Sequence, residues 1–231
     1  MARAPEVNEN FLREVDEEVR RDQALRVWRQ YGKWIIAGLV AALLALGGWL
    51  WWQNARAKEA EAAGERLSIA LGQLEAGNAT AATPALEELA KGGAEGPKIV
   101  ASMALAAAAL DKGDLKRAVG LYDGVATDTG APQPYRDAAT LRSVAAQFDT
   151  LPPAQAIDRL KGLALPGKPW FGSAGEMTAI SYLRLGKRRE AGELFGALAR
   201  DRTVPATIRS RAVQLAGSMG IEVPADDKGN P

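Results

Sequence analysis

The reactive side chains of this 231-residue chain are hydroxyls, carboxylates and cations, because its sequence contains no histidine and no cysteine. Without these two residue types, the usual zinc and copper sites, cysteine nucleophiles and Ser-His-Asp triads are excluded. The sequence shows no glycine-rich phosphate loop and advertises no convergent pair of carboxylates for acid and base catalysis. We therefore expect a non-enzymatic protein with no cofactor and no metal site.

Side chains suited to binding another protein occur as arginines and aromatic residues in the second half of the chain. They are Arg136, Arg142, Trp170, Phe171, Tyr182, Arg184, Arg209 and Arg211. Two interpretations stay open: these residues form a partner-binding surface, or the arginines are simply solvated and the aromatics pack between structural elements. A nucleic-acid partner is not expected, since the net charge is only +1.

The first element that must position these residues is an apolar segment. Nineteen residues from Trp34 to Trp52 carry no charge, and as a helix they would span roughly 28 Å, close to the hydrocarbon thickness of a bilayer. Trp34 at one end and Trp49, Trp51 and Trp52 at the other match the aromatic belts of membrane interfaces. We predict a single transmembrane helix with these tryptophans as membrane anchors and lipid as its surroundings.

Basic residues beside this segment predict its orientation, because cytoplasmic flanks carry the excess of Lys and Arg. Five precede the segment and three follow it, namely Arg20, Arg21, Arg26, Arg29 and Lys33 against Arg56, Lys58 and Arg66. The N-terminus is therefore expected in the cytoplasm. A cleaved signal peptide ending at Ala55-Arg56-Ala57 is disfavoured, because the apolar run exceeds the roughly 7 to 15 residues of a signal and the preceding segment is long and acidic.

Four regions follow from this topology: a cytoplasmic juxtamembrane segment (1–33), the transmembrane helix (34–52), a domain outside the cytoplasm (53–221) and a flexible tail (222–231). The juxtamembrane arginines either touch anionic head groups or a cytosolic partner, or they are solvated and only fix the topology. Within the span, small residues at four-residue spacing would let a second transmembrane helix approach, although chance also produces such spacing in alanine-rich spans. They are Ala37, Gly38, Ala41, Ala42 and Ala45.

Beyond the apolar segment the chain is alanine-rich and repeats with a period of 35 to 38 residues. One column holds Ala82, Ala118, Ala156 and Ala191; four residues later come Leu86, Tyr122, Leu160 and Phe195; twelve residues earlier stand Ala70, Ala106, Val144 and Ala179. Five residues before each column alanine comes Gly77, Gly113, Leu151 or Gly186, and prolines recur as Pro97, Pro134, Pro169 and Pro205. Four columns in phase indicate a true structural repeat.

The columns predict pairs of antiparallel helices. Glycine supplies the turn, the small residue lets the helices cross closely, the larger residue fills the gap, and proline suits the first turn of the next helix. The predicted pairs are 98–111 with 115–125, 135–148 with 153–163 and 170–185 with 188–198, preceded by a helix at about 54–76 and closed by an unpaired helix at 206–218. Thr150 is expected to cap the helix after Pro152, where the turn glycine is missing.

This order of markers resembles the tetratricopeptide repeat, whose regular period is 34. The predicted fold is therefore all-α, a transmembrane helix followed by a tetratricopeptide-like solenoid. Such solenoids present a concave surface, lined by the first helix of each pair, that binds peptides or proteins.

The chain from about Glu14 to Ile221, a single span followed by an alanine-rich repeat domain, resembles the YfgM-type ancillary subunits of the bacterial SecYEG translocon. The more specific part of this resemblance is the anchor region, with Trp28-Arg-Gln-Tyr-Gly-Lys33 before the span and Gly47-Gly48-Trp49-Leu-Trp-Trp52 at its end. The resemblance implies an inner-membrane protein with a periplasmic repeat domain. It also implies the SecYEG translocon and a PpiD-type periplasmic chaperone as partners, linked by a non-enzymatic adaptor. A cell-envelope scaffold in division or outer-membrane assembly stays the alternative, and the sequence does not predict an oligomeric state.

Overall fold

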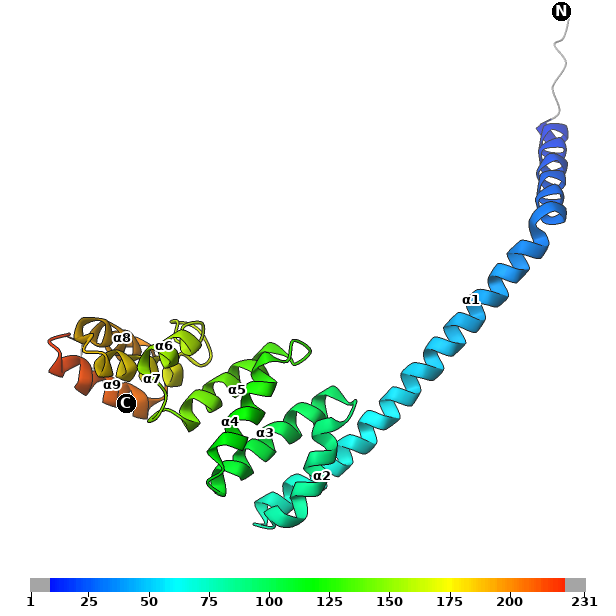
Figure 1. Ribbon diagram of the computed structural model, residues 1–231. Coiled ribbons are helices and arrows are strands. Elements are labelled where there is room, and N and C mark those ends of the chain that lie inside the picture. Colours follow the sequence, from blue (N-terminus) through cyan, green and yellow to red (C-terminus); the bar gives the residue numbers. More distant parts are fainter. Residues whose placement is uncertain (1–8, 223–231) are drawn as a thin grey trace, which may run out of the picture. The chain divides into compact units, whose positions relative to one another are not determined.

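The computed structural model describes the backbone of residues 9–222 and the side chains of residues 28–222. Within these residues it contains nine helices and no strand (Figure 1), which confirms the all-α prediction. The helices are α1 (Glu9–Glu75), α2 (Ala79–Lys91), α3 (Glu95–Asp111), α4 (Leu115–Thr127), α5 (Gln133–Ala146), α6 (Pro153–Leu160), α7 (Phe171–Arg184), α8 (Arg188–Arg200) and α9 (Ala206–Ser218). The chain divides into two compact units, Met1–Lys58 and Glu59–Pro231.

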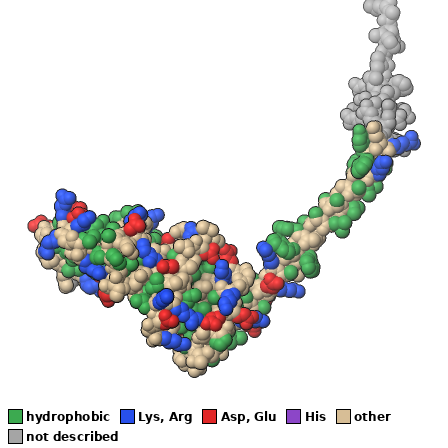
Figure 2. Space-filling model, in the orientation of Figure 1, with side chains coloured by type: hydrophobic (Ala, Val, Ile, Leu, Met, Phe, Trp, Pro, Cys, Tyr) green, Lys and Arg blue, Asp and Glu red, His purple; other side chains and the backbone are tan. Residues whose placement is uncertain are grey.

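The apolar segment lies in the part of α1 that belongs to the first unit. Its side chains are exposed, with Trp34 at 69% and Leu44 at 72%, and Figure 2 shows hydrophobic side chains along this helix. An 18-residue window has a mean hydropathy of 2.0 and no buried residue. The helix is long and apolar enough to cross a membrane, whereas the core helix of a soluble protein would be mostly buried.

Two of the sequence predictions fall outside the described residues. They concern the side chains of Arg20, Arg21 and Arg26, and the tail after Glu222.

Helix crossings in the second unit are built on fully buried alanines. Ala82, Ala118, Ala156 and Ala191 are each 0% exposed, and their larger companions Leu86, Tyr122, Leu160 and Phe195 are at most 3% exposed. An alanine lets two helix backbones approach, and the larger residue one turn later fills the remaining space. Each helix from α2 to α9 packs on the next along the chain, so the predicted register of the repeat is confirmed.

Three of the turns between paired helices use glycine in the left-handed region. Gly77, Gly113 and Gly186 have φ values of 80°, 77° and 72°, which glycine adopts at no steric cost. The fourth turn carries Leu151, whose side chain is buried in the core cluster around Leu160. A leucine there needs a different turn, and its amide donates to the Gln147 carbonyl at 2.7 Å.

Thr150 does not cap α6, so that prediction is wrong. Its hydroxyl donates backwards to the Gln147 carbonyl at 3.2 Å, and Pro152 occupies the N-cap position without a side-chain hydrogen bond. The prolines follow the prediction in α3 and α5, where Pro97 and Pro134 lie in the first turn. Pro205 directly precedes α9 instead, and Pro169 lies one residue before Trp170, the N-cap of α7.

The C-terminal end of the second unit is closed by α9 and the residues after it. Gly192 and Gly196 on α8 lie under Ile221, and a Cβ added at either glycine would be 3.0 Å from that side chain. The exposed positions of α9 are largely polar or small, as terminal repeats of solenoids require. No helix follows α9 in the described residues, and the residues after α9 pack on α8 instead.

The left-handed turns make a testable prediction. We expect Gly113→Ala to destabilise the protein by about 1 kcal/mol, because an L-residue in this region costs about 1 to 2 kcal/mol. Gly120→Ala is the matched control: Gly120 lies inside α4 with no atom within 4 Å of an added Cβ, so alanine should stabilise by about 0.5 to 1 kcal/mol. Urea denaturation measures both. A Gly113→Ala variant as stable as the parent would contradict the turn geometry.

Candidate functional site

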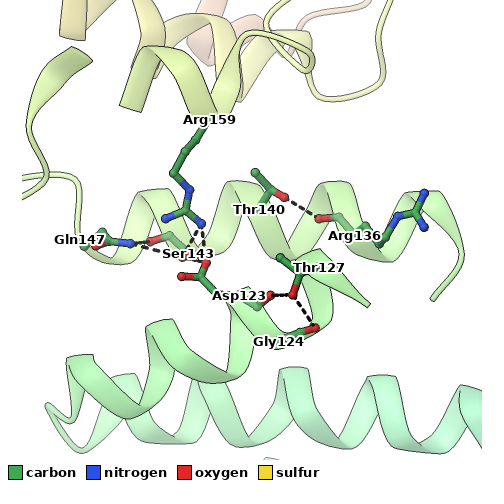
Figure 3. Close-up of polar contacts among 8 residues, drawn as sticks. All are labelled: Asp123, Gly124, Thr127, Arg136, Thr140, Ser143, Gln147 and Arg159. Carbon is green, nitrogen blue, oxygen red and sulfur yellow. Dashed lines mark hydrogen bonds and ion pairs between the residues drawn. The ribbon is translucent and has the colours of Figure 1, made fainter. Parts of the chain in front are cut away.

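Three helices of the second unit meet in a polar network (Figure 3). Asp123 of α4, Ser143 of α5 and Arg159 of α6 point toward one another. The Ser143 hydroxyl donates to the Asp123 carboxylate at 2.6 Å, and the Arg159 guanidinium donates to Ser143 Oγ at 3.1 Å while pairing with Asp123. The Gln147 amide donates to the Ser143 carbonyl at 3.2 Å. One carboxylate thus joins three consecutive helices.

The chemistry of this network is structural. Ser143 is 0% exposed, so no substrate can reach its hydroxyl. The side chains of Arg159 and Asp123 are 28% and 40% exposed. The network therefore clamps α6, which is only eight residues long, to the two helices before it.

The sequence analysis missed this network, although the repeat register contains a trace of it. Asp123 lies five residues after the column alanine of α4, and Arg159 lies three residues after that of α6. Ser143 directly precedes Val144, the compact residue of α5. An acid and a base at these offsets in successive repeats are the pattern that would have indicated an ion pair between them.

The five arginines predicted to bind a partner lie on α5, α7 and α9. Four of them already make side-chain hydrogen bonds to other residues of the same chain. Arg184 donates to the Phe148 carbonyl at 2.7 Å and lies 5.6 Å from the centroid of that ring. It thereby satisfies a carbonyl beyond the end of α5. Arg209 donates to the Val204 carbonyl at 2.6 Å in the loop before its own helix.

The other two engaged arginines behave similarly. Arg136 donates to the Thr129 carbonyl at 3.3 Å. Arg211 of α9 makes two bonds to the Glu176 carboxylate of α7, at 2.7 and 2.9 Å, and this carboxylate raises the pKa of Arg211. Each of these contacts holds an arginine side chain against a neighbouring element. Their binding of a partner stays a prediction.

Arg142 is the exposed exception on α5. It acts on the Tyr122 hydroxyl through space: burial raises the pKa of Tyr122, Arg142 opposes that shift, and Asp111 adds to it. Among the aromatics, Phe171 is 1% exposed and belongs to the core around Phe195. Trp170 and Tyr182 are partly buried, so they alone of the three remain accessible to a partner.

Two loops between repeats are held by aspartates with lowered pKa values. Asp128 accepts from Lys98 Nζ at 3.1 Å and from the Gly130 amide at 3.0 Å, and these hydrogen bonds lower its pKa. Asp201 accepts from the hydroxyl and amide of Thr203, which lower its pKa in the same way. Each aspartate follows its column alanine by ten residues, so this loop device also follows the repeat.

The predicted anchor residues of the first unit are all exposed. Trp34, Trp49, Trp51 and Trp52 are 48 to 73% exposed, and the Arg56 guanidinium lies 3.8 Å from the Trp52 ring centroid. The small residues Ala37, Gly38, Ala41, Ala42 and Ala45 are exposed as well. A Cβ added at Gly38 would meet no atom within 4 Å, so a second helix would find this side open. Pairing with such a helix stays a prediction.

Among the described residues, no three His, Cys, Asp or Glu side chains lie close enough together to hold a metal ion.

Paired antiparallel helices in a regular register, with an exposed apolar helix before them, define this protein as an α-helical repeat protein. A family model described as a tetratricopeptide repeat-like domain matches residues 26–214, and the chain belongs to this family. Repeat domains of this kind typically bind other proteins through their extended surfaces. No curated protein and no solved structure matches the chain.

The clamp predicts a measurable coupling. Arg159→Ala should destabilise the protein by about 1 to 3 kcal/mol, because it leaves Asp123 without its charged partner in a partly buried site. Ser143→Ala and the double variant complete a double-mutant cycle, with an expected interaction energy of about 0.5 kcal/mol or more. Lys161→Ala is the control, since its pair with Asp158 is 72% exposed on both sides and should contribute under about 0.5 kcal/mol. Equal losses for Arg159→Ala and Lys161→Ala in urea denaturation would refute the clamp.

Proposed function

We propose that this protein is a non-enzymatic, membrane-anchored adaptor at the bacterial SecYEG translocon, where it links protein export to a PpiD-type periplasmic chaperone. One observation carries the proposal: the helix that contains the exposed apolar segment, α1, also supplies the first helix of the repeat unit. A protein-binding domain attached to a membrane helix has a high effective concentration near membrane partners, so that weak contacts suffice.

The export context is supported by the anchor's resemblance to YfgM-type subunits. The more specific part of that resemblance lies in the residues around both ends of the span, from Trp28 to Lys33 and from Gly47 to Trp52. The excess of Lys and Arg before the span favours a cytoplasmic N-terminus, and the repeat domain would then face the periplasm of a bacterial inner membrane. The exposed small-residue side of the span is the surface we assign to contact with translocon helices.

The topology can be tested directly because the chain has no native cysteine. We expect Thr80→Cys, at the start of α2, to react in intact spheroplasts with a membrane-impermeant maleimide, because the repeat domain faces the periplasm. Ala4→Cys should react only after the membrane is opened. The reverse labelling pattern would refute the proposed orientation, and labelling of both sites in sealed spheroplasts would refute a membrane-spanning anchor.

Partnership is tested by affinity purification of the full chain in mild detergent. We expect translocon subunits and a periplasmic chaperone to co-purify with it, and replacement of the five small residues of the span by leucine to reduce the translocon yield at least about five-fold, because bulky side chains keep helices apart. The matched control changes Leu43, Leu44 and Leu46 to isoleucine, which preserves an apolar surface. Recovery of division or outer-membrane assembly proteins without translocon subunits would replace the proposal with the scaffold alternative.

A further inference from the structure

A hollow of about 400 Å³ lies between α2 and α4, with α3 as its floor. Its apolar lining comes from Ala90, Leu105 and Leu121, and its charged lining from Glu87, Lys91 and Arg117. Such a volume lies at the lower end of ligand clefts in proteins, roughly 300 to 1,000 Å³. It has room for a few side chains, which favours a peptide segment over a globular surface.

The hollow continues along α3. A smaller hollow of about 40 Å³ shares Leu105 and Arg117 with it and extends to Ala108 and Lys112. The two together form a groove, here called the α2–α4 groove, that passes from Lys91 at the end of α2 to Lys112 at the end of α3. Leu105 is common to both hollows, whereas Lys91 lines only the larger one and Lys112 only the smaller one.

The next repeat carries different side chains at the equivalent positions. Glu87, Leu105 and Leu121 occupy the same places in the register as Asp123, Ser143 and Arg159. In the later repeat the arginine of α6 reaches across to the aspartate of α4 and pairs with it (Figure 3). In the α2–α4 groove the corresponding residue is a leucine, which cannot pair with Glu87 and leaves the hollow open.

The charges of the groove decide which partner fits it. Glu87 already pairs with Arg117 at 2.5 Å, and the Asp114 carboxylate accepts the Arg117 backbone amide at 3.1 Å. Both acids lining the groove are therefore occupied. Lys91 and Lys112 are exposed and make no side-chain hydrogen bond or ion pair among the described residues. Two unpaired cations at the ends of an apolar floor complement apolar side chains flanked by carboxylates.

We propose that the α2–α4 groove binds a peptide segment of a partner protein in which leucine-type side chains are flanked by acidic residues. The apolar side chains enter the hollow over Leu105, and the carboxylates pair with Lys91 and Lys112. The groove lies between the second helices of two pairs, α2 and α4. It is thus separate from the surface of first helices on which the sequence analysis placed partner binding, and the inference rests on the adaptor role proposed above.

The test uses the full chain in lipid nanodiscs and fluorescence anisotropy of a fluorescein-labelled 12-residue peptide with two leucines between pairs of glutamates. We expect this peptide to bind at least about ten-fold more tightly than the same peptide with lysines in place of the glutamates. Lys91→Glu and Lys112→Glu should each weaken binding about five-fold, and added salt should weaken it further. Lys116→Glu is the matched control, because Lys116 is exposed on α4 but does not line the groove.

A second pair of variants closes the groove. Leu121→Arg places an arginine opposite Glu87, as Arg159 lies opposite Asp123 in the later repeat. Ser102→Phe places a large side chain in the hollow, whose lining includes Ser102. Both should abolish binding while circular dichroism and the thermal midpoint show a folded protein. If Leu121→Arg fails to fold, Ser102→Phe and the lysine variants still decide the question.

Several results would overturn the inference. Equal affinity for the acidic and basic peptides, binding that survives both groove-closing variants, or no binding of the acidic peptide would each do so. Sedimentation that shows a dimer dissociated by Leu121→Arg would assign the groove to a second copy of this chain instead. Translocon co-purification, measured on the same variants, separates the two proposals. If translocon subunits still co-purify while the peptide fails to bind, the adaptor role stands and the groove proposal fails. If the peptide binds but no translocon subunit is recovered, the adaptor role fails.

Discussion

The close crossing of helices at alanine is the contact on which the second unit depends. Ala82, Ala118, Ala156 and Ala191 are fully buried, and any larger side chain at these places would push two backbones apart. An alanine buries little apolar area, so each crossing stabilises the fold only modestly by the hydrophobic effect. Stability must then be summed over several crossings and over the larger residues that follow them, as in a chain of nearest-neighbour units.

Polar contacts supplement this alanine core where the repeat is irregular. The pair α5 and α6 lacks the turn glycine and has the shortest helix among those described, and it is there that Asp123, Ser143 and Arg159 join three helices. Arg184 supports the same region by bonding to the carbonyls of Phe148 and Asp149. The pair without a turn glycine is therefore the one in which a single carboxylate joins three helices.

The sequence predicted helix pairs and core columns well because a close crossing demands a small residue at the same place in every repeat. The sequence did not predict which groups the ends of the long arginine side chains would bind. Spacing places Arg184 on the first helix of a pair and Arg209 on the unpaired last helix, but only the structure shows that their guanidiniums bend back onto carbonyls of neighbouring loops. The α2–α4 groove could not be predicted for a related reason. Its register position 121 holds a leucine, whereas the equivalent position in the later repeat holds Arg159, which pairs with an aspartate. Thr150 misled because threonine at a turn can bond forwards or backwards.

Ile221 makes the last described helix pair different from the internal repeats. It covers Gly192 and Gly196 on α8, two positions with no side chain of their own. A duplicated helix pair inserted after α9 would separate Ile221 from these glycines by more than thirty residues of new chain, at about the period of one repeat. Gly192 and Gly196 would then lose the contact with Ile221, and another side chain would have to pack on them. Growth of the domain by tandem duplication is thus easier between internal repeats, where alanine crossings are interchangeable, than at its C-terminal end.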